Sequence, residues 1–266
     1  MTLYYEKRGN GPILVVSPTL EGDAGYTVDL IDRLVDHYTV VTYDRRGLSR
    51  SATDRRGAGV TMAEHADDLH HLVAGLTDEP VRMLGCGIGA VIGLHLAMGH
   101  PAQVGALVAH EPVAPPLLPA DARGHYERQL AGIQEIHRRD GVAAAFRAVA
   151  RSFGLSAAPV EPGLTPHPLT PRRVVNFGFL VEHDCTALAQ DDADYAALQE
   201  STVRIVPAYG GATPPASFAH RCAVELAGLL GIEPVVFPGG HDGGVTHPRA
   251  YAARLVEVLD REEGPA

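Results

Sequence analysis

The sequence contains little cysteine, no block of positive charge and no long apolar run. Its three cysteines are odd in number and widely separated, and none has a second cysteine at metal-ligand spacing, so neither a disulfide framework nor a metal site is expected. Lysine and arginine number 22 against 32 acidic residues, and no basic run exceeds a pair, so nucleic acid is not an expected partner. The longest apolar runs fall far short of the roughly 18 residues that a membrane span needs.

The amino-terminal residues lack the basic start and apolar stretch of a secretory signal, so a cytoplasmic protein without membrane contact is expected. With 266 residues, of which 45% are hydrophobic, the chain can bury its own core. The composition leaves the oligomeric state open, a homodimer included.

Apolar runs of strand length recur along the chain, each followed by Gly, Pro or Asp and then by helical periodicity. They cover residues 13–17, 38–43, 81–84, 104–109, 203–208 and 234–237. A capping box, Thr61 to Glu64, precedes one helical stripe. Short, wholly apolar runs are typical of buried parallel strands with helices on both faces. The pattern predicts an α/β fold with a mostly parallel central sheet.

This alternation breaks once, over residues 112–199, where helical patterns surround a proline-rich stretch. We interpret this segment as a helical lid inserted into a core made of residues 1–111 and 200–266. It leaves one strand at its carboxyl end, so it is expected to lie over the edge where open α/β sheets bind ligands.

The segment from Val81 to Ala90 predicts a strand, a sharp glycine-rich turn and a helix. It resembles the nucleophile elbow, G-x-S-x-G, of the α/β-hydrolase fold. Residues 17–19, 43–50 and 239–243 stand where that family places its other loops. The resemblance covers essentially the whole chain and implies the α/β-hydrolase fold.

The tip of the elbow departs from the family pattern, because Gly87 stands where the nucleophile belongs. Glycine has no side chain with which to form an acyl-enzyme. Loss of the nucleophile costs on the order of 10⁶ in turnover where the catalytic residues act as a unit. The neighbouring Cys86 is expected to point elsewhere, as a small apolar side chain that lines the substrate site.

The resemblance implies that His241 is the general base. The usual acid position, after the penultimate strand, holds no carboxylate over residues 209–213. A second acid position of the fold, at the end of the strand after the elbow helix, holds Glu111. Glu111 is therefore expected to orient His241 and to stabilise its cation, with Asp242 as the lesser candidate.

Backbone N–H groups form the oxyanion hole of this fold, and they do not depend on side chains. The resemblance assigns this role to Ile88, at the start of the elbow helix, and to Thr19 or Leu20 in the first loop. Other side chains from the loops and lid are expected to line the cleft. These are Tyr26, Cys86, His110, His125, Tyr126, Phe177, Phe179, His183 and Asp242.

The favoured hypothesis is non-hydrolytic, cofactor-independent acid/base catalysis on a small substrate, such as C–C bond formation, cyclisation or a lyase reaction. The chain resembles hydrolase-like proteins among bacterial secondary-metabolite tailoring enzymes, which implies an aromatic or polyketide-like substrate. A hydrolase that activates water directly and an inactive, ligand-binding member of the fold remain alternatives. So does a dinucleotide-binding turn, because Gly85, Gly87 and Ala90 also fit G-x-G-x-x-A with Glu111 as the ribose acid.

Overall fold

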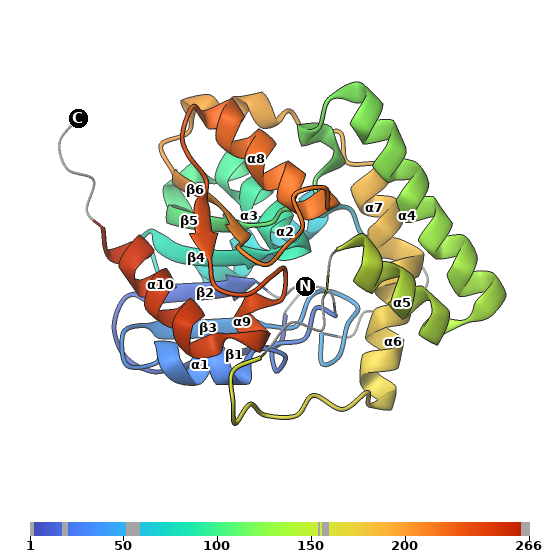
Figure 1. Ribbon diagram of the computed structural model, residues 1–266. Coiled ribbons are helices and arrows are strands. Elements are labelled where there is room, and N and C mark those ends of the chain that lie inside the picture. Colours follow the sequence, from blue (N-terminus) through green and yellow to red (C-terminus); the bar gives the residue numbers. More distant parts are fainter. Residues whose placement is uncertain (1–2, 18–20, 52–58, 154, 156–159, 262–266) are drawn as a thin grey trace.

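The computed structural model describes residues 3–17, 21–51, 59–153, 155 and 160–261 (Figure 1). Its centre is a seven-stranded sheet with the order β1-β3-β2-β4-β5-β6-β7. The strands are β1 (Tyr5–Arg8), β2 (Ile13–Ser17), β3 (Thr39–Tyr43), β4 (Val81–Cys86), β5 (Val104–His110), β6 (Arg204–Gly210) and β7 (Val235–Phe237). Only β1 pairs antiparallel with its neighbour, β3, so the predicted mostly parallel sheet is confirmed.

Each of the six predicted strands is present, and β1 is the one that the apolar pattern did not reveal. Its sequence, Tyr-Glu-Lys-Arg, is polar and largely exposed because it forms one edge of the sheet. An edge strand contacts a neighbour on one side only, so it needs no apolar run to be stable there.

Helices cover both faces of the sheet (Figure 1). They are α1 (Val28–Leu34), α2 (Met62–Ala74), α3 (Ile88–Gly99), α4 (Ala120–Asp140), α5 (Val142–Ser152), α6 (Pro171–Phe179), α7 (Cys185–Ala189), α8 (Phe218–Leu230), α9 (Gly243–Thr246) and α10 (Pro248–Asp260). Apolar side chains of α1 and α10 form one core cluster with the sheet, and those of α2, α3 and α8 form the other. None of the helices in the described ranges has the length and apolarity of a membrane span.

The predicted capping box of α2 is confirmed. The Oγ1 atom of Thr61 accepts a hydrogen bond from the Glu64 N–H at 3.1 Å, and the Glu64 carboxylate accepts one from the Thr61 N–H at 3.0 Å. These two bonds satisfy N–H groups that the first turn of a helix leaves without partners. The sequence therefore specifies where α2 begins.

The segment between β5 and β6, which we expected to be a lid, contains α4 to α7 and a five-residue π-helix (Leu180–Asp184). Leu130 and Phe177 of this segment belong to the same apolar cluster as α3 and the sheet. Asp184 also forms a 2.7 Å ion pair with Arg45 of the core, and both side chains are fully buried. The helical segment and the sheet thus share one continuous core.

Candidate active site

The elbow lies between β4 and α3, with Gly87 at its tip. Gly87 has φ 56° and ψ −115°, a conformation that costs residues with a Cβ atom about 1–3 kcal/mol. Its N–H donates to the carbonyl of His110 at 3.0 Å, and its own carbonyl accepts from the Ala90 N–H at 3.1 Å. The turn therefore has the strained elbow geometry, and glycine adopts it without that cost.

The two flanking glycines of the motif are required by packing. A Cβ atom on Gly85 would lie 2.6 Å from the Cα atom of Ala90, and one on Gly89 would lie 2.4 Å from the carbonyl oxygen of Ser17. Both distances are far below van der Waals contact, so only glycine lets α3 start this close to β2 and β4. The glycine-rich sequence thus encodes the elbow whether or not a nucleophile stands at its tip.

Glu111 and His241 are in contact, as the sequence led us to expect. The Nδ1 atom of His241 lies 2.8 Å from Oε2 of Glu111, and both side chains are buried. The other carboxylate oxygen of Glu111 accepts a hydrogen bond from the Gly210 N–H at 2.9 Å. Glu111 itself has φ 48°, a left-handed conformation that is rare for a residue with a side chain. This strain occurs at the residue that holds the imidazole.

The electrostatics of Glu111 favour the ionised carboxylate. Burial by itself raises its pKa, but the hydrogen bond and the charge of His241, together with His110, outweigh burial and lower the pKa to about 2. An ionised carboxylate can only accept hydrogen bonds, so Nδ1 of His241 carries the proton. In the neutral imidazole, Nε2 then has the free lone pair.

The Nε2 atom of His241 is buried and has no hydrogen-bond partner among the described residues. The ring of Phe153, at the end of α5, lies beside the imidazole with 5.3 Å between the ring centroids. An imidazole nitrogen with an unused lone pair can take a proton from a group that comes within hydrogen-bond reach, which is the role of a general base.

The elbow and the imidazole meet at the carboxyl edge of the sheet. Cys86 pairs with His110 in register, the N–H of Gly87 bonds the His110 carbonyl, and Glu111 follows directly. From the other side, Nε2 of His110 donates to the carbonyl of Gly240 at 3.3 Å. One residue, His110, thus connects the elbow to the loop that carries His241.

The expected role of His110 as a cleft residue is wrong. Its ring is fully buried against Phe237 and Tyr251, at centroid distances of 5.7 and 5.4 Å. Burial lowers its pKa to about 4, so the ring is neutral at physiological pH. His110 supports the site from behind rather than lining it.

Cys86 and two aromatic residues are also placed differently from the expectation. The Sγ atom of Cys86 lies 3.7 Å from the Tyr251 hydroxyl in the α1–α10 cluster, and burial raises the pKa of this thiol to about 12. Tyr126 stacks on Phe218 at 4.3 Å and donates to a backbone carbonyl. Phe177 is buried in the main core cluster. These side chains stabilise the core because burying their apolar surface removes it from water.

The remaining predicted residues lie around the helical segment and the loops. His125 is exposed on α4, whereas Phe179 and His183 are half-buried and their rings lie 4.7 Å apart. Asp242 is half-buried at the start of α9, and burial raises its pKa. Tyr26 is half-buried in the loop before α1.

Of the predicted oxyanion donors, the structure describes Ile88 alone. Ile88 is the first residue of α3, so its N–H belongs to the first turn and has no intrahelical acceptor. Thr19 and Leu20 lie outside the described residues. Of the described residues, no group of three or more His, Cys, Asp or Glu side chains is arranged to hold a metal ion.

Sequence reasoning missed Gly210 as the second partner of Glu111. A Cβ atom at this position would lie 2.4 Å from the carbonyl oxygen of Gly240, so glycine is required where β6 meets the loop of His241. The sequence did contain a signal for this role, because Gly210 lies in residues 209–213, the stretch where the usual acid is missing. The backbone N–H at that position binds the carboxylate that arrives from β5 instead.

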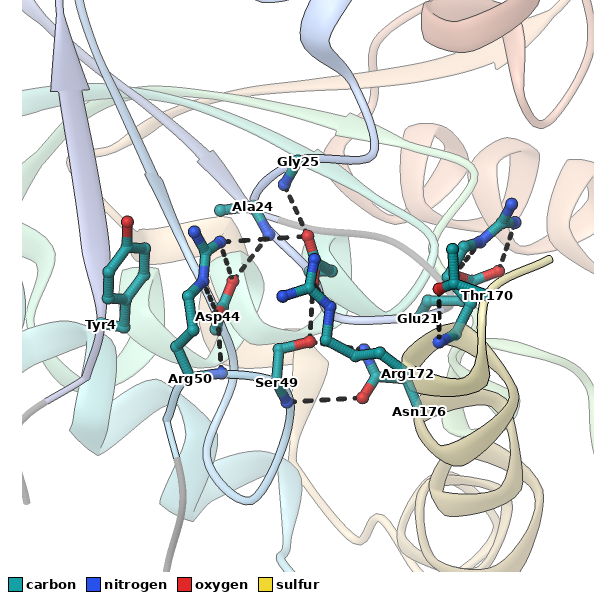
Figure 2. Close-up of polar contacts among 12 residues, drawn as sticks. Tyr4, Glu21, Ala24, Gly25, Asp44, Ser49, Arg50, Thr170, Arg172 and Asn176 are labelled. Carbon is teal, nitrogen blue, oxygen red and sulfur yellow. Dashed lines mark hydrogen bonds and ion pairs between the residues drawn. The ribbon is translucent and has the colours of Figure 1, made fainter. Parts of the chain in front are cut away.

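A polar network joins the loops that follow β2 and β3 to α6 (Figure 2). The buried carboxylate of Asp44 accepts hydrogen bonds from the Ala24 N–H at 2.9 Å and from Arg50 at 2.7 and 2.9 Å. The Ser49 hydroxyl donates to Asp23 at 2.6 Å and accepts from the side-chain amide of Asn176 on α6 at 2.7 Å. The motif at residues 43–50 therefore joins the loop before α1 to the helical segment.

Comparison with known proteins identifies the family. The model of the alpha/beta hydrolase fold family matches residues 12–177. A Bacillus subtilis (strain 168) protein named uncharacterized hydrolase YraK is 32% identical over 265 residues, which are 98% of this chain and 93% of that protein. The chain therefore belongs to the alpha/beta hydrolase fold family. Membership in this family points to an enzyme of the hydrolase type.

Solved structures agree on the fold. A bromoperoxidase from Bacillus anthracis superposes with a TM-score of 0.74 at 20% identity, over 97% of this chain and 95% of that one. The enol-lactonase from Burkholderia xenovorans LB400 superposes with a TM-score of 0.66 at 19% identity, over 97% and 96% of the two chains. At this level of identity the superpositions show the shared fold alone.

Proposed function

We propose that the protein is an enzyme in which His241, held by Glu111, acts as a general base without a covalent acyl-enzyme intermediate. The observation that carries this proposal is the buried Nε2 atom of His241, which has no partner among the described residues and stands at a sheet edge whose elbow tip is Gly87. The base is in place, and the elbow offers no nucleophile for it to activate.

The proposed reaction is hydrolysis of an activated carbonyl substrate by water. The Nε2 atom of His241 takes a proton from water, and the water oxygen bonds the carbonyl carbon. The carbonyl oxygen becomes an oxyanion that accepts a hydrogen bond from the Ile88 N–H. Collapse of this intermediate breaks the bond to the leaving group, which takes the proton from Nε2. Glu111 stabilises the imidazolium that exists between the two proton transfers.

Membership in a hydrolase family and the hydrolase name of the full-length relative favour water as the proton donor. General-base catalysis contributes about 10²–10⁴ in rate, and one oxyanion donor contributes about 10²–10³. These contributions suit a substrate with a good leaving group, such as an enol or aryl ester. An ordinary ester needs the additional step that an attacking side chain provides.

Gly87 also favours a second candidate, non-hydrolytic proton transfer. In that reaction Nε2 of His241 takes the proton from a C–H group next to a carbonyl or from a phenol. The resulting enolate or phenolate would then undergo C–C bond formation, cyclisation or a lyase-type cleavage on a small, aromatic or polyketide-like substrate. No nucleophile is needed for this chemistry, which is consistent with the elbow.

Two generic probes test the proposal and separate the two reactions. Hydrolysis of p-nitrophenyl acetate reports water activation, and base-catalysed opening of 5-nitrobenzisoxazole reports proton abstraction from carbon. We expect hydrolysis without a burst of nitrophenolate, and we expect it to be lost in H241A. The control H71A, whose imidazole is 64% exposed on α2, should match the wild type. Ring opening without hydrolysis would support the second candidate.

The variant G87S tests the site independently of the natural substrate. It restores an attacking hydroxyl beside the base and the oxyanion donor. A fluorophosphonate probe should then label position 87 of G87S, and it should label neither wild type nor the double variant G87S/H241A. If G87S stays unlabelled and His241 affects neither probe reaction, the ligand-binding alternative replaces the proposed enzyme.

A further inference from the structure

A pocket of about 150 Å³ lies between the loop before α1 and the segment that leads into α6. Its walls carry Tyr26, Pro166, His167 and Pro168, and the charged side chains of Arg172 and Asp23 line it as well. Figure 2 shows Arg172 directed from α6 toward the loop that contains Gly25. The mechanism proposed above does not use these residues.

The walls of this pocket are held by an ion pair on one side and by hydrogen bonds on the other. Arg173 binds both carboxylate oxygens of Glu21 at 2.6 Å and also donates to the carbonyl of Pro168 at 3.1 Å. Upstream, Thr165 donates two hydrogen bonds to the Asp29 carboxylate, each at 2.7 Å. A pocket held in this way before binding loses less entropy when a ligand enters.

The lining favours a flat ring. The rings of Tyr26 and His167 lie 5.3 Å apart and are tilted by 46°, and the guanidinium carbon of Arg173 lies 5.3 Å from the Tyr26 ring centroid. Two prolines add flat apolar surface. A cavity of roughly 150 Å³ holds one benzene ring, whereas whole ligand sites are usually about 300–1,000 Å³. The pocket therefore has room for one aromatic ring.

The charges around the pocket are unevenly paired. Glu21 is paired with Arg173, and Asp23 accepts hydrogen bonds from the Ser49 hydroxyl at 2.6 Å and the Gly25 N–H at 2.7 Å. Arg172 forms an ion pair with Asp23 at 3.6 Å, which is longer than a hydrogen bond, and its side chain is 57% exposed. The guanidinium of Arg172 can therefore bind an acidic group at the mouth of the pocket.

The helix that follows the Tyr26 wall of the pocket, α1, packs against α9, the short helix after His241. Burial, with the nearby charge of Glu21 and a smaller effect of Asp242, raises the pKa of Tyr26 to about 12. In addition, a Cβ atom on Gly244 would lie 3.1 Å from Leu30, because α9 packs on the helix that begins just after Tyr26. The pocket and the segment that carries His241 are thus connected through the packing of α1 on α9.

We propose that this pocket is the subsite for an aromatic ring that carries a carboxylate, at the non-reacting end of the substrate. Tyr26 and His167 contact the ring, and Arg172 binds the carboxylate. The inference rests on the proposed function, because it treats the His241–Glu111 pair as the reacting centre. It narrows the substrate to aryl carboxylates with an activated carbonyl or an acidic proton at the other end.

Binding of three fragments to H241A protein tests the subsite without any turnover. The probes are benzoate, its neutral analogue benzamide and its non-aromatic analogue cyclohexanecarboxylate, titrated by amide chemical-shift changes in NMR spectra. We expect benzoate to shift the signals of residues 23–26 and 166–173. Benzamide should bind about three- to five-fold more weakly, as an exposed ion pair predicts. Cyclohexanecarboxylate should bind about ten-fold more weakly because it lacks a π face.

Matched variants assign the contacts. R172A should weaken benzoate about three- to five-fold and leave benzamide unchanged, whereas R8A, an exposed arginine on β1, should change neither. Y26L should weaken both aromatic fragments about ten-fold, and Y26F should not. Equal affinity for benzoate and cyclohexanecarboxylate, or unchanged binding in R172A and Y26L, would overturn the proposal. If the fragments bind to H241A as expected but the wild-type protein is inactive on every probe, the proposed enzymatic function is refuted, whereas the assignment of the pocket as a binding site for aryl carboxylates stands.

Discussion

Replacing Glu111 by glutamine tests the centre of the site with almost no change in shape. The amide oxygen can still accept the hydrogen bond from the Gly210 N–H, which is 2.9 Å long in the wild type. The amide NH₂ then faces Nδ1 of His241, 2.8 Å away in the present geometry, and Nδ1 must become the acceptor. The proton moves to Nε2, so the imidazole loses the lone pair that the proposed mechanism uses.

The catalytic effect follows from this tautomer. In serine proteases the equivalent acid-to-amide change lowers turnover by about 10⁴, and a non-covalent general base is expected to lose about 10²–10⁴ because base catalysis supplies no more than that. E111Q should therefore fall to the rate of H241A on p-nitrophenyl acetate.

The stability effect follows from the pKa of Glu111, which is lowered to about 2 from the ordinary value of 4.5. Between these values the unfolded chain binds more protons than the folded protein, so the contribution of Glu111 is complete above about pH 5 and is lost as the pH falls toward 2. A shift of about 2.5 units corresponds to about 3 kcal/mol, of which roughly 1 to 2 kcal/mol is lost by about pH 3.5.

Urea unfolding of both proteins at about pH 7 and pH 3.5 measures this effect. The difference in unfolding free energy between wild type and E111Q should shrink by roughly 1 to 2 kcal/mol at the lower pH. E135Q, which changes an exposed carboxylate on α4, should keep the pH profile of the wild type. If E111Q retains wild-type turnover, or if its pH profile parallels that of the wild type, the assignment of Glu111 as the ionised partner of His241 is wrong.

Two further substitutions test the packing that supports the site, each against a control and each measured by urea unfolding. G89A should cost at least about 2 kcal/mol because the new Cβ atom would lie 2.4 Å from the backbone of β2, whereas G132A on α4 meets nothing within 4 Å and should gain about 0.5–1 kcal/mol. D184N should cost about 3 kcal/mol because it removes the charge of the carboxylate from the fully buried Arg45–Asp184 ion pair, whereas D32N, in an exposed pair on the surface, should cost less than about 1 kcal/mol. A small effect of G89A or D184N would contradict the contacts described for them.

Much of the site could be predicted because its backbone is encoded locally. The spacing of Gly85, Gly87 and Gly89 specified the elbow, since each glycine meets a steric demand within a few residues of itself or at the adjoining strand. The position of Glu111 at the end of β5 followed from the strand pattern. Its contact with His241 then required only that parallel strands end at one edge.

Side-chain direction could not be predicted in the same way. Cys86 was expected to line the substrate site, yet its side chain lies in the cluster of α1 and α10. Tyr126 and Phe177 carried the same aromatic signal as the other residues expected in the cleft, but helix packing buries them in the core. Which face of a helix or strand meets solvent depends on what packs against it, and no local pattern contains that information.

By itself, the sequence determined the strands of the sheet other than β1, the start of α2 and the shape of the elbow, because periodicity, capping and glycine sterics act over a few residues. Tertiary structure alone decided the left-handed backbone of Glu111, the second hydrogen bond from Gly210 and the lack of a partner at Nε2 of His241 among the described residues. Glu111 and His241 are 130 residues apart, and their contact exists only once β5, β6 and the last loop are assembled. Within that assembled edge, the hydrogen bond and charge of His241, together with His110, keep Glu111 ionised against the effect of burial, and the ionised carboxylate fixes the tautomer of His241.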